Sequence, residues 1–247
     1  MQHAKEDYVA ALDQPVANLR LGIPRAPFFD HIDEDTSKAI ESAIVVLSKL
    51  TRSTKDVVLP STAAYTWATL NNIGNEIYAY HESLFRDRSA RYSLSFQLQL
   101  QVFKDNMNAP TTSASAQVSA YICHHWDLEL LRRTIDDAFA DFDLVVLPTL
   151  RIVPTKLRYV IDQEESTKAH SPGPLDLYNC TPFNVYGIPA ISIPCGFSHD
   201  GLPVGLMIAG PHFSEGKILA LARAYERETM WNLRRPPLTP NTPIPPI

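Results

Sequence analysis

The chain has 247 residues, of which 45% are hydrophobic and 20% charged, a composition typical of a soluble globular protein with a buried core. Its formal net charge of −5 argues against nucleic acid as the main partner, because binding a phosphate backbone needs an excess of basic side chains. No apolar run approaches the length of a membrane span, and the first residues lack the apolar segment of a secretory signal, so we expect a cytoplasmic protein with no membrane partner.

The first third of the chain has the pattern of a strand–helix–strand unit. Residues 19–24 read as a short strand ended by Pro24, and three acidic residues at 33–35 mark a helix start, where the helix dipole favours negative charge. One face of that helix is apolar, with Ile40, Ala43, Ile44, Leu47 and Leu50 at helical spacing. A second strand over 55–60 follows, and this order of elements predicts a partly parallel sheet.

The middle of the chain is expected to be helical. Residues 61–108 contain a single glycine, and Pro110 ends that stretch. A long helix over 115–141 then places Leu128, Leu131, Ile135 and Phe139 on one side, and 143–149 reads as a buried strand. The connection over 149–178 is long and polar, and a loop of that length is uncommon in a compact domain unless it is functional or mobile.

The C-terminal part combines two strands with a helix. The apolar runs 190–193 and 204–209 are bounded by Gly and Pro, which predicts strands covered on both faces, and Asp200-Gly201 between them predicts a hairpin turn. Ser214 is a candidate N-cap of a helix whose apolar face carries Ile218, Leu221, Ala222 and Tyr225. Together these elements predict an α/β fold in which a mixed β-sheet is flanked by helices. Six prolines in the last twelve residues predict an extended tail over 232–247.

A dense set of residues between 181 and 229 carries a resemblance to a known family. It includes Thr181-Pro182, Asn184, Gly187-Ile188-Pro189-Ala190, Pro194-Cys195-Gly196-Phe197 and Asp200-Gly201-Leu202-Pro203-Val204-Gly205-Leu206. This run closely resembles the C-terminal segment of the amidase signature family, serine hydrolases that cleave the carbon–nitrogen bonds of amides. The resemblance implies that residues 1–231 form the C-terminal portion of an amidase-type domain, a partial α/β/α sandwich. It also implies a small-molecule amide as the family's substrate.

The residues that break the amide bond in this family have no counterpart in this sequence. The family uses a serine nucleophile, a second serine on a cis peptide bond and a buried lysine, with both serines in a Gly/Ser-rich stretch. This chain has no Gly-Ser-Ser-Gly-like run and only 9 glycines. We therefore expect no catalytic residue here and a truncated chain that is inactive alone. We also expect self-association through the edge of the core that is left uncovered.

Other functions stay open beside the inactive amidase portion. The chain could be a non-catalytic binding or scaffold protein, or one half of a split amidase. The family also contains the amide-transferring subunit of tRNA-dependent amidotransferases, which is a remote alternative here. The polar residues expected of that subunit do not align with the segment 175–180, which is out of step by about a residue.

Three residues are candidates for a role near the substrate. By resemblance, Thr181, Pro182 and Asn184 line the acyl pocket or support the catalytic loop, and a role for Asn184 in capping backbone groups is equally favoured. Ser192 lies within an apolar run and lacks the GxSxG elbow of a nucleophile. We expect it to be a small buried hydroxyl bonded to the backbone.

Neither the cysteines nor the histidines form a recognisable reactive or metal-binding motif. Cys123, Cys180 and Cys195 include no CxxC pair, and we expect reduced, small, buried residues, with Cys195 an inert packing residue. His124 and His125 are adjacent, so on a helix they point about 100° apart and lack the i, i+4 spacing of paired ligands. We expect solvated or capping histidines, no metal site and no cofactor.

Overall fold

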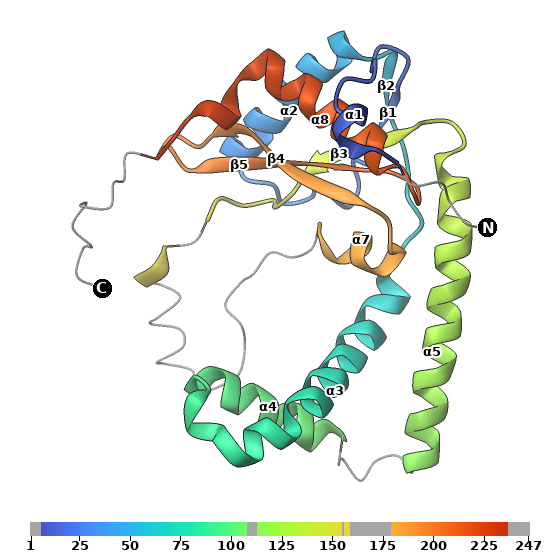
Figure 1. Cartoon of the computed structure of the whole chain (residues 1–247), viewed down its shortest axis with the longest axis vertical. Coiled ribbons are helices and arrows are strands. Elements are labelled where there is room, and N and C mark those ends of the chain that lie inside the picture. The colour runs from blue at the N-terminus through green and yellow to red at the C-terminus, as the bar shows by residue number, and fades with distance from the viewer. Residues whose placement is uncertain (1–5, 108–112, 155, 159–178, 237–247) are drawn as a thin grey trace. The chain divides into compact units, whose positions relative to one another are not determined.

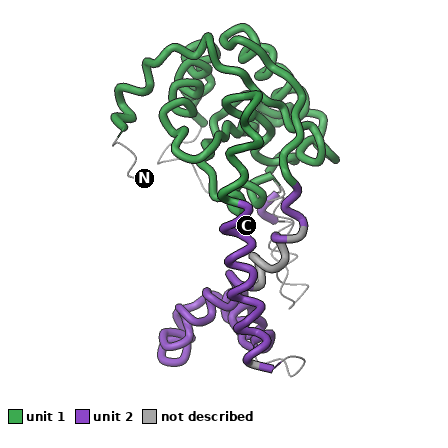
Figure 2. The backbone as a smooth tube through the Cα atoms, turned by 90° about the vertical axis from the view of Figure 1, so that its right-hand side faces the viewer, with its two compact units in different colours: residues 1–60, 132–154, 176–247 green, residues 61–131, 155–175 purple. Residues whose placement is uncertain are grey.

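A computed structural model describes residues 6–107, 113–154, 156–158 and 179–236. Pro110, most of the connection predicted over 149–178 and residues 237–247 of the predicted tail lie outside these ranges. The chain divides into two compact units (Figure 2): one comprises residues 1–60, 132–154 and 176–247, and the other residues 61–131 and 155–175. Within the described ranges, every helix is too short or too polar to cross a bilayer.

The first unit is built on a five-stranded mixed sheet. Its strands are β1 (Arg20–Ile23), β2 (Ser53–Asp56), β3 (Leu144–Pro148), β4 (Ala190–Phe197) and β5 (Pro203–Ala209). They lie in the order β2-β1-β3-β5-β4. β1 runs parallel to β2 and β3, whereas β5 runs antiparallel to both β3 and β4. The α/β fold with a mixed sheet, predicted from the sequence, is confirmed.

Helix α2 (Glu34–Leu50) completes the predicted parallel unit between β1 and β2. Asp33 caps its N-terminus by accepting a hydrogen bond from the backbone N–H of Thr36 at 2.9 Å. The second strand of the unit begins and ends earlier than 55–60, because β1 ends at Ile23 and its register pairs that residue with Asp56. Among the described residues the pairing of β2 stops at Asp56, and Val58 is 85% exposed.

Two helices cover one face of the sheet (Figure 1). α2 and α8 (Glu215–Thr229) pack there, with the short α1 (Tyr8–Ala11) against α8. The core between helices and sheet contains Leu21, Ile40, Leu47, Leu144, Val146, Ile193, Leu206, Ile208, Leu221 and Tyr225. Alternate strand residues point to the other face. There Val145, Leu147 and Met207 are also buried, and α7 (Thr181–Tyr186) lies on that side.

The hairpin predicted at Asp200-Gly201 joins β4 and β5, and Gly201 adopts the positive φ of 77° that this turn requires. The prediction that both strands are covered on two faces is wrong for β4. This strand is the last of the sheet, and Ala190 and Ser192 are exposed while Ile193 and Cys195 are buried. An apolar run cannot show whether its strand is central or at an edge, because that depends on which strands pair with it.

The second unit is helical, as predicted. It contains α3 (Ala63–Arg88), a 3-10 turn (Ser89–Arg91), α4 (Leu94–Met107) and most of α5 (Ala114–Thr134). The helix predicted over 115–141 changes to a 3-10 helix at Ile135–Phe139, before β3. In the first unit, a 3-10 turn (Trp231–Leu233) follows α8.

Candidate functional site

The three residues predicted to lie near the substrate begin helix α7. Thr181 and Pro182 are half-buried and Asn184 is exposed, while Phe183 and Val185 on the same short helix are buried. Pro182 lies in the first turn, where its missing N–H costs no helical hydrogen bond. Gly187 ends the helix with φ of 72°. The Asn184 side chain is therefore exposed on a helix whose other face is buried. The role of Asn184 as a substrate contact or a backbone cap stays a prediction.

A buried asparagine just before α7 anchors this helix to the sheet. Asn179 is 1% exposed, and its Nδ2 donates hydrogen bonds to the carbonyl oxygens of Phe28, at 3.0 Å, and Pro148, at 2.7 Å. Pro148 ends β3, so one amide ties α7 to both the strand end and the loop after β1. Sequence reasoning missed this residue, because an asparagine in a polar stretch gives no sign that it is buried.

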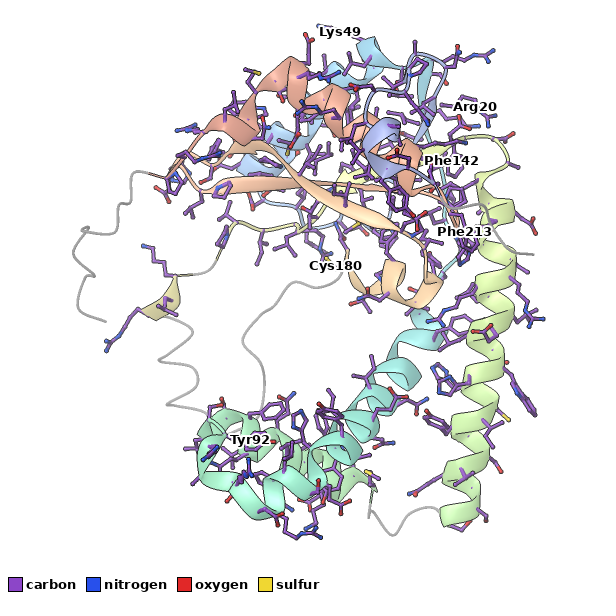
Figure 3. The ribbon with its side chains drawn as sticks, in the orientation of Figure 1. Arg20, Lys49, Tyr92, Phe142, Cys180 and Phe213 are labelled. Atoms are coloured by element: carbon purple, nitrogen blue, oxygen red, sulfur yellow. The ribbon has the colours of Figure 1, made fainter. Side chains whose placement is uncertain are left out.

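Two further hydrogen bonds hold the far end of α7. The Tyr186 hydroxyl donates to the carbonyl of Pro60, and burial raises the pKa of this phenol to about 12. The Nε of Arg132, at the end of α5, donates to the carbonyl of Val185 at 3.2 Å. α7 is thus fixed at both ends to the unit that contains the sheet. Figure 3 labels Cys180, the residue between the Asn179 anchor and the helix.

A hollow of about 360 Å³ lies beside the β4 edge of the sheet. Four elements contribute to it: the first turn of α2, the segment after β3, and the facing parts of β4 and β5. It is lined by Thr36, Thr149, Leu150, Ile152, Val153, Pro154, Ser192, Ile193, Pro194, Pro203, Val204 and Gly205. Thr181, Pro182 and Asn184 are not among these described lining residues. Among the described residues, the hollow and the three predicted residues are therefore separate groups.

The walls of the hollow are apolar except for hydroxyl groups, two of which bond to each other. Thr149 Oγ1 and Ser192 Oγ lie 2.6 Å apart. They meet above Gly205, where an added Cβ would lie 2.8 Å from the Ser192 oxygen and 3.0 Å from the Thr149 oxygen. The expectation that Ser192 is buried and bonded to backbone is wrong. Because β4 is an edge strand of the described sheet, the Ser192 side chain is exposed, and its partner Thr149 follows β3, two strands away across β5.

Asp33 holds the segment that forms one wall of the hollow. Its carboxylate accepts hydrogen bonds from the backbone N–H of Val153 at 2.8 Å and from the Thr36 hydroxyl at 2.9 Å. The Asp33 N–H in turn donates to the carbonyl of Arg151 at 2.9 Å. The N-cap of α2 therefore also fixes the chain after β3, so one carboxylate joins two of the four elements that line the hollow.

The hydroxyl pair has no base beside it in the described ranges. Within these ranges the Ser192 and Thr149 hydroxyl oxygens bond to each other and to no titratable side chain, although the Cys180 thiol donates to the Thr149 backbone carbonyl at 3.6 Å. No described lysine Nζ bonds to a described serine hydroxyl. An unactivated serine is a weak nucleophile. The two hydroxyls can therefore orient a polar group by hydrogen bonding but have nothing in these ranges that would take a proton from serine.

The burial of individual cysteines and histidines departs in places from the sequence prediction. Cys195 is buried, its thiol donates to the Val204 carbonyl at 3.5 Å, and burial raises the thiol pKa to about 12, which fits an inert packing residue. Cys123, in contrast, is exposed and Cys180 half-buried. His124 is buried rather than solvated. Among the described residues no group of three or more His, Cys, Asp or Glu side chains is placed to hold a metal ion.

Comparison with known proteins identifies a family. The family model described as Amidase matches residues 1–219. Among curated proteins, a glutamyl-tRNA(Gln) amidotransferase subunit from Thiobacillus denitrificans is 28% identical over 253 residues, covering 96% of this chain and 50% of that protein. A glutamyl-tRNA(Gln) amidotransferase subunit from Clostridium acetobutylicum is 29% identical over 244 residues, covering 92% of this chain and 49% of its own length.

Solved structures share the fold. A 6-aminohexanoate cyclic dimer hydrolase in complex with its substrate superimposes with a TM-score of 0.75 at 21% identity, over 96% of this chain and 50% of the hydrolase. The peptide amidase PAM, in complex with the competitive inhibitor chymostatin, gives a TM-score of 0.65 at 28% identity, over 96% of this chain and 48% of the amidase. The chain spans about half the length of the curated relatives it matches.

Proposed function

The chain belongs to the amidase family, and from this premise we propose that it supplies half of the scaffold of a serine amidase whose bond-breaking residues lie in the half that it does not match. Residues 1–231 are then the C-terminal portion of an amidase-type domain, and residues 232–247 a Pro-rich extended tail. The substrate of the complete enzyme is a small-molecule amide. The chain alone is inactive and associates with itself through uncovered surface.

The reaction of the complete enzyme proceeds through an acyl-serine. A serine hydroxyl attacks the amide carbonyl carbon, the carbon–nitrogen bond breaks, and the amine leaves with a proton. Water then attacks the acyl-serine ester, releases the acid and restores the serine. Both attacks need a group that accepts a proton, together with donors that stabilise the oxyanion.

The observation that carries the proposal is the hydroxyl pair in the hollow. In the described ranges Ser192 shares its hydrogen bond with Thr149, where an acting nucleophile would bond to a base. The other residues that line the hollow are apolar apart from the hydroxyl of Thr36, and none of the described lining residues is charged. Such a hollow can hold the apolar part of an amide but lacks the groups that cleave it.

A hydrolysis assay tests this proposal. The purified 247-residue chain is incubated with a panel of chromogenic anilides, beside a Ser192→Ala variant as the matched control. We expect no release of the aniline above buffer from either protein. Turnover by the unmodified chain that disappears in Ser192→Ala would overturn the proposal, because it would place the nucleophile in this chain.

Two alternatives make different predictions. A scaffold or binding protein gives no turnover under any conditions, whereas one half of a split amidase gives turnover when the complementary polypeptide is added. The names of the curated relatives favour a third, an amidotransferase component. The net charge of −5 argues against a tRNA-binding surface on this chain, so a gel-shift assay with tRNA is expected to show no complex.

Cytoplasmic localisation remains a prediction that a fluorescent fusion can test.

A further inference from the structure

The two edges of the sheet differ in how they are protected. The β2 edge carries Lys55 and Asp56, and both are in ion pairs: Lys55 with Asp141 at 3.5 Å and Asp56 with Arg25 at 3.2 Å. Charged side chains on an edge strand discourage pairing with another chain. β4, at the other edge, reads AISIPCGF and has no charged residue. β4 is therefore the edge at which another strand can add.

The hydrogen-bond pattern shows which backbone groups of β4 face outward. The N–H of Gly210 donates to the carbonyl of Pro189 at 3.2 Å, so this pair bonds across the hairpin. Bonded and non-bonded pairs alternate along antiparallel strands. In the register of β4 and β5, Ile191 and Ile193 then bond to β5, and Ala190, Ser192 and Pro194 point their backbone groups to the free side.

An independent contact agrees with this assignment. The N–H of Thr149 donates to the carbonyl of Gly205 at 2.9 Å, so Gly205 bonds toward β3 and away from Pro194, its opposite residue on β4. Proline in a sheet is confined to positions where the missing N–H faces away from the neighbouring strand. Pro194 meets that condition, because its nitrogen lies on the free side.

We propose that a second copy of this chain adds to β4 in antiparallel orientation, with the two-fold axis passing between the two Ser192 residues. Each Ser192 N–H then donates to the Ser192 carbonyl of the other copy. Each Ala190 N–H donates to the Pro194 carbonyl of the other copy, and only the Ala190 carbonyl is left to water, since proline has no N–H to offer. The register of β4 shifts between Pro194 and Gly196, and the pairing of the two copies ends there.

A second copy fits this edge because the outward groups are self-complementary about Ser192. The exposed side chains on this edge are also small: Ala190 and Ser192 are exposed, and the Ser192 hydroxyl bonds to Thr149 over Gly205, which leaves room for an incoming strand as far as the described residues go. The inference rests on the self-association named in the proposed function and locates it. The test of this inference measures molecular mass and amide exchange, whereas the test of the amidase proposal measures hydrolysis. Either proposal can therefore fail while the other stands.

Introducing a charged side chain at the two-fold axis tests the proposal. In the dimer a side chain at position 192 lies opposite its own copy, where like charges are destabilising. We expect Ser192→Lys and Ser192→Glu each to raise the dimer Kd by up to about fivefold in sedimentation experiments. An equimolar mixture of the two variants should restore a Kd near that of the unmodified chain. Ser53→Lys on the β2 edge is the matched control and should leave the Kd unchanged.

Amide exchange provides a readout that needs no substitution. The Ala190 and Ser192 N–H groups should exchange quickly in dilute samples and slowly at concentrations where the chain is dimeric. The Ile191 and Ile193 amides, bonded to β5 in both states, should be protected throughout. A chain that stays monomeric, variants with an unchanged Kd, a mixture that does not recover, or unprotected Ala190 and Ser192 amides in the dimer would each overturn the proposal.

Discussion

Replacing Asn179 by alanine is expected to destabilise the unit that contains the sheet and to release α7. The substitution leaves the carbonyls of Phe28 and Pro148 without the buried amide that donates to both. A buried group that loses its partner costs about 1–3 kcal/mol, and carbonyls retain some other contacts, so we expect a total loss of about 2–4 kcal/mol. The small cavity left by the missing amide adds to this loss.

Urea unfolding followed by circular dichroism measures the change in free energy of unfolding, and hydrogen exchange follows the α7 amides. Asn184→Ala is the matched control, because it removes the same amide from an exposed position on α7 and should change stability by no more than about 0.5 kcal/mol. A loss below about 1 kcal/mol for Asn179→Ala, or equal losses for the two variants, would refute the argument that Asn179 anchors the helix.

Three further predictions concern the hairpin, the hollow and the core. Hydrogen bonding to Asp35 raises the pKa of His199, and the same bond lowers the pKa of Asp35. Their stabilisation is therefore greatest between the ordinary Asp and His pKa values. It falls as pH rises through the raised pKa of His199 or drops through the lowered pKa of Asp35, and His199→Gln should flatten this dependence of Tm on pH. Gly205→Ala should cost about 1–3 kcal/mol in urea unfolding, and adding Ser192→Ala should recover part of the loss, because it removes the oxygen that the new methyl group meets. Cys195 should resist iodoacetamide in the folded chain and react in urea, as read by mass spectrometry, since burial raises the pKa of its thiol.

Local patterns predicted most of the secondary structure of the sheet unit. The acidic start and apolar face of α2, the Asp-Gly hairpin and the face of α8 all follow from interactions between residues close in sequence. The predictions that failed concern residues whose surroundings come from distant segments. The second strand ends at Asp56 because β1, about thirty residues earlier, ends at Ile23, and no local feature of 55–60 contains that limit.

The sequence by itself determined two things about this protein: the family to which it belongs, and the absence of the Gly/Ser-rich stretch that carries the family's serines. Both are properties of residue identity and order. Only the tertiary structure decided that β4 is the last strand of the described sheet, that Ser192 is exposed beside Thr149, and that Asn179 is buried. The physical reason is that burial and pairing depend on which distant strands become neighbours, and the residues around each position do not specify this.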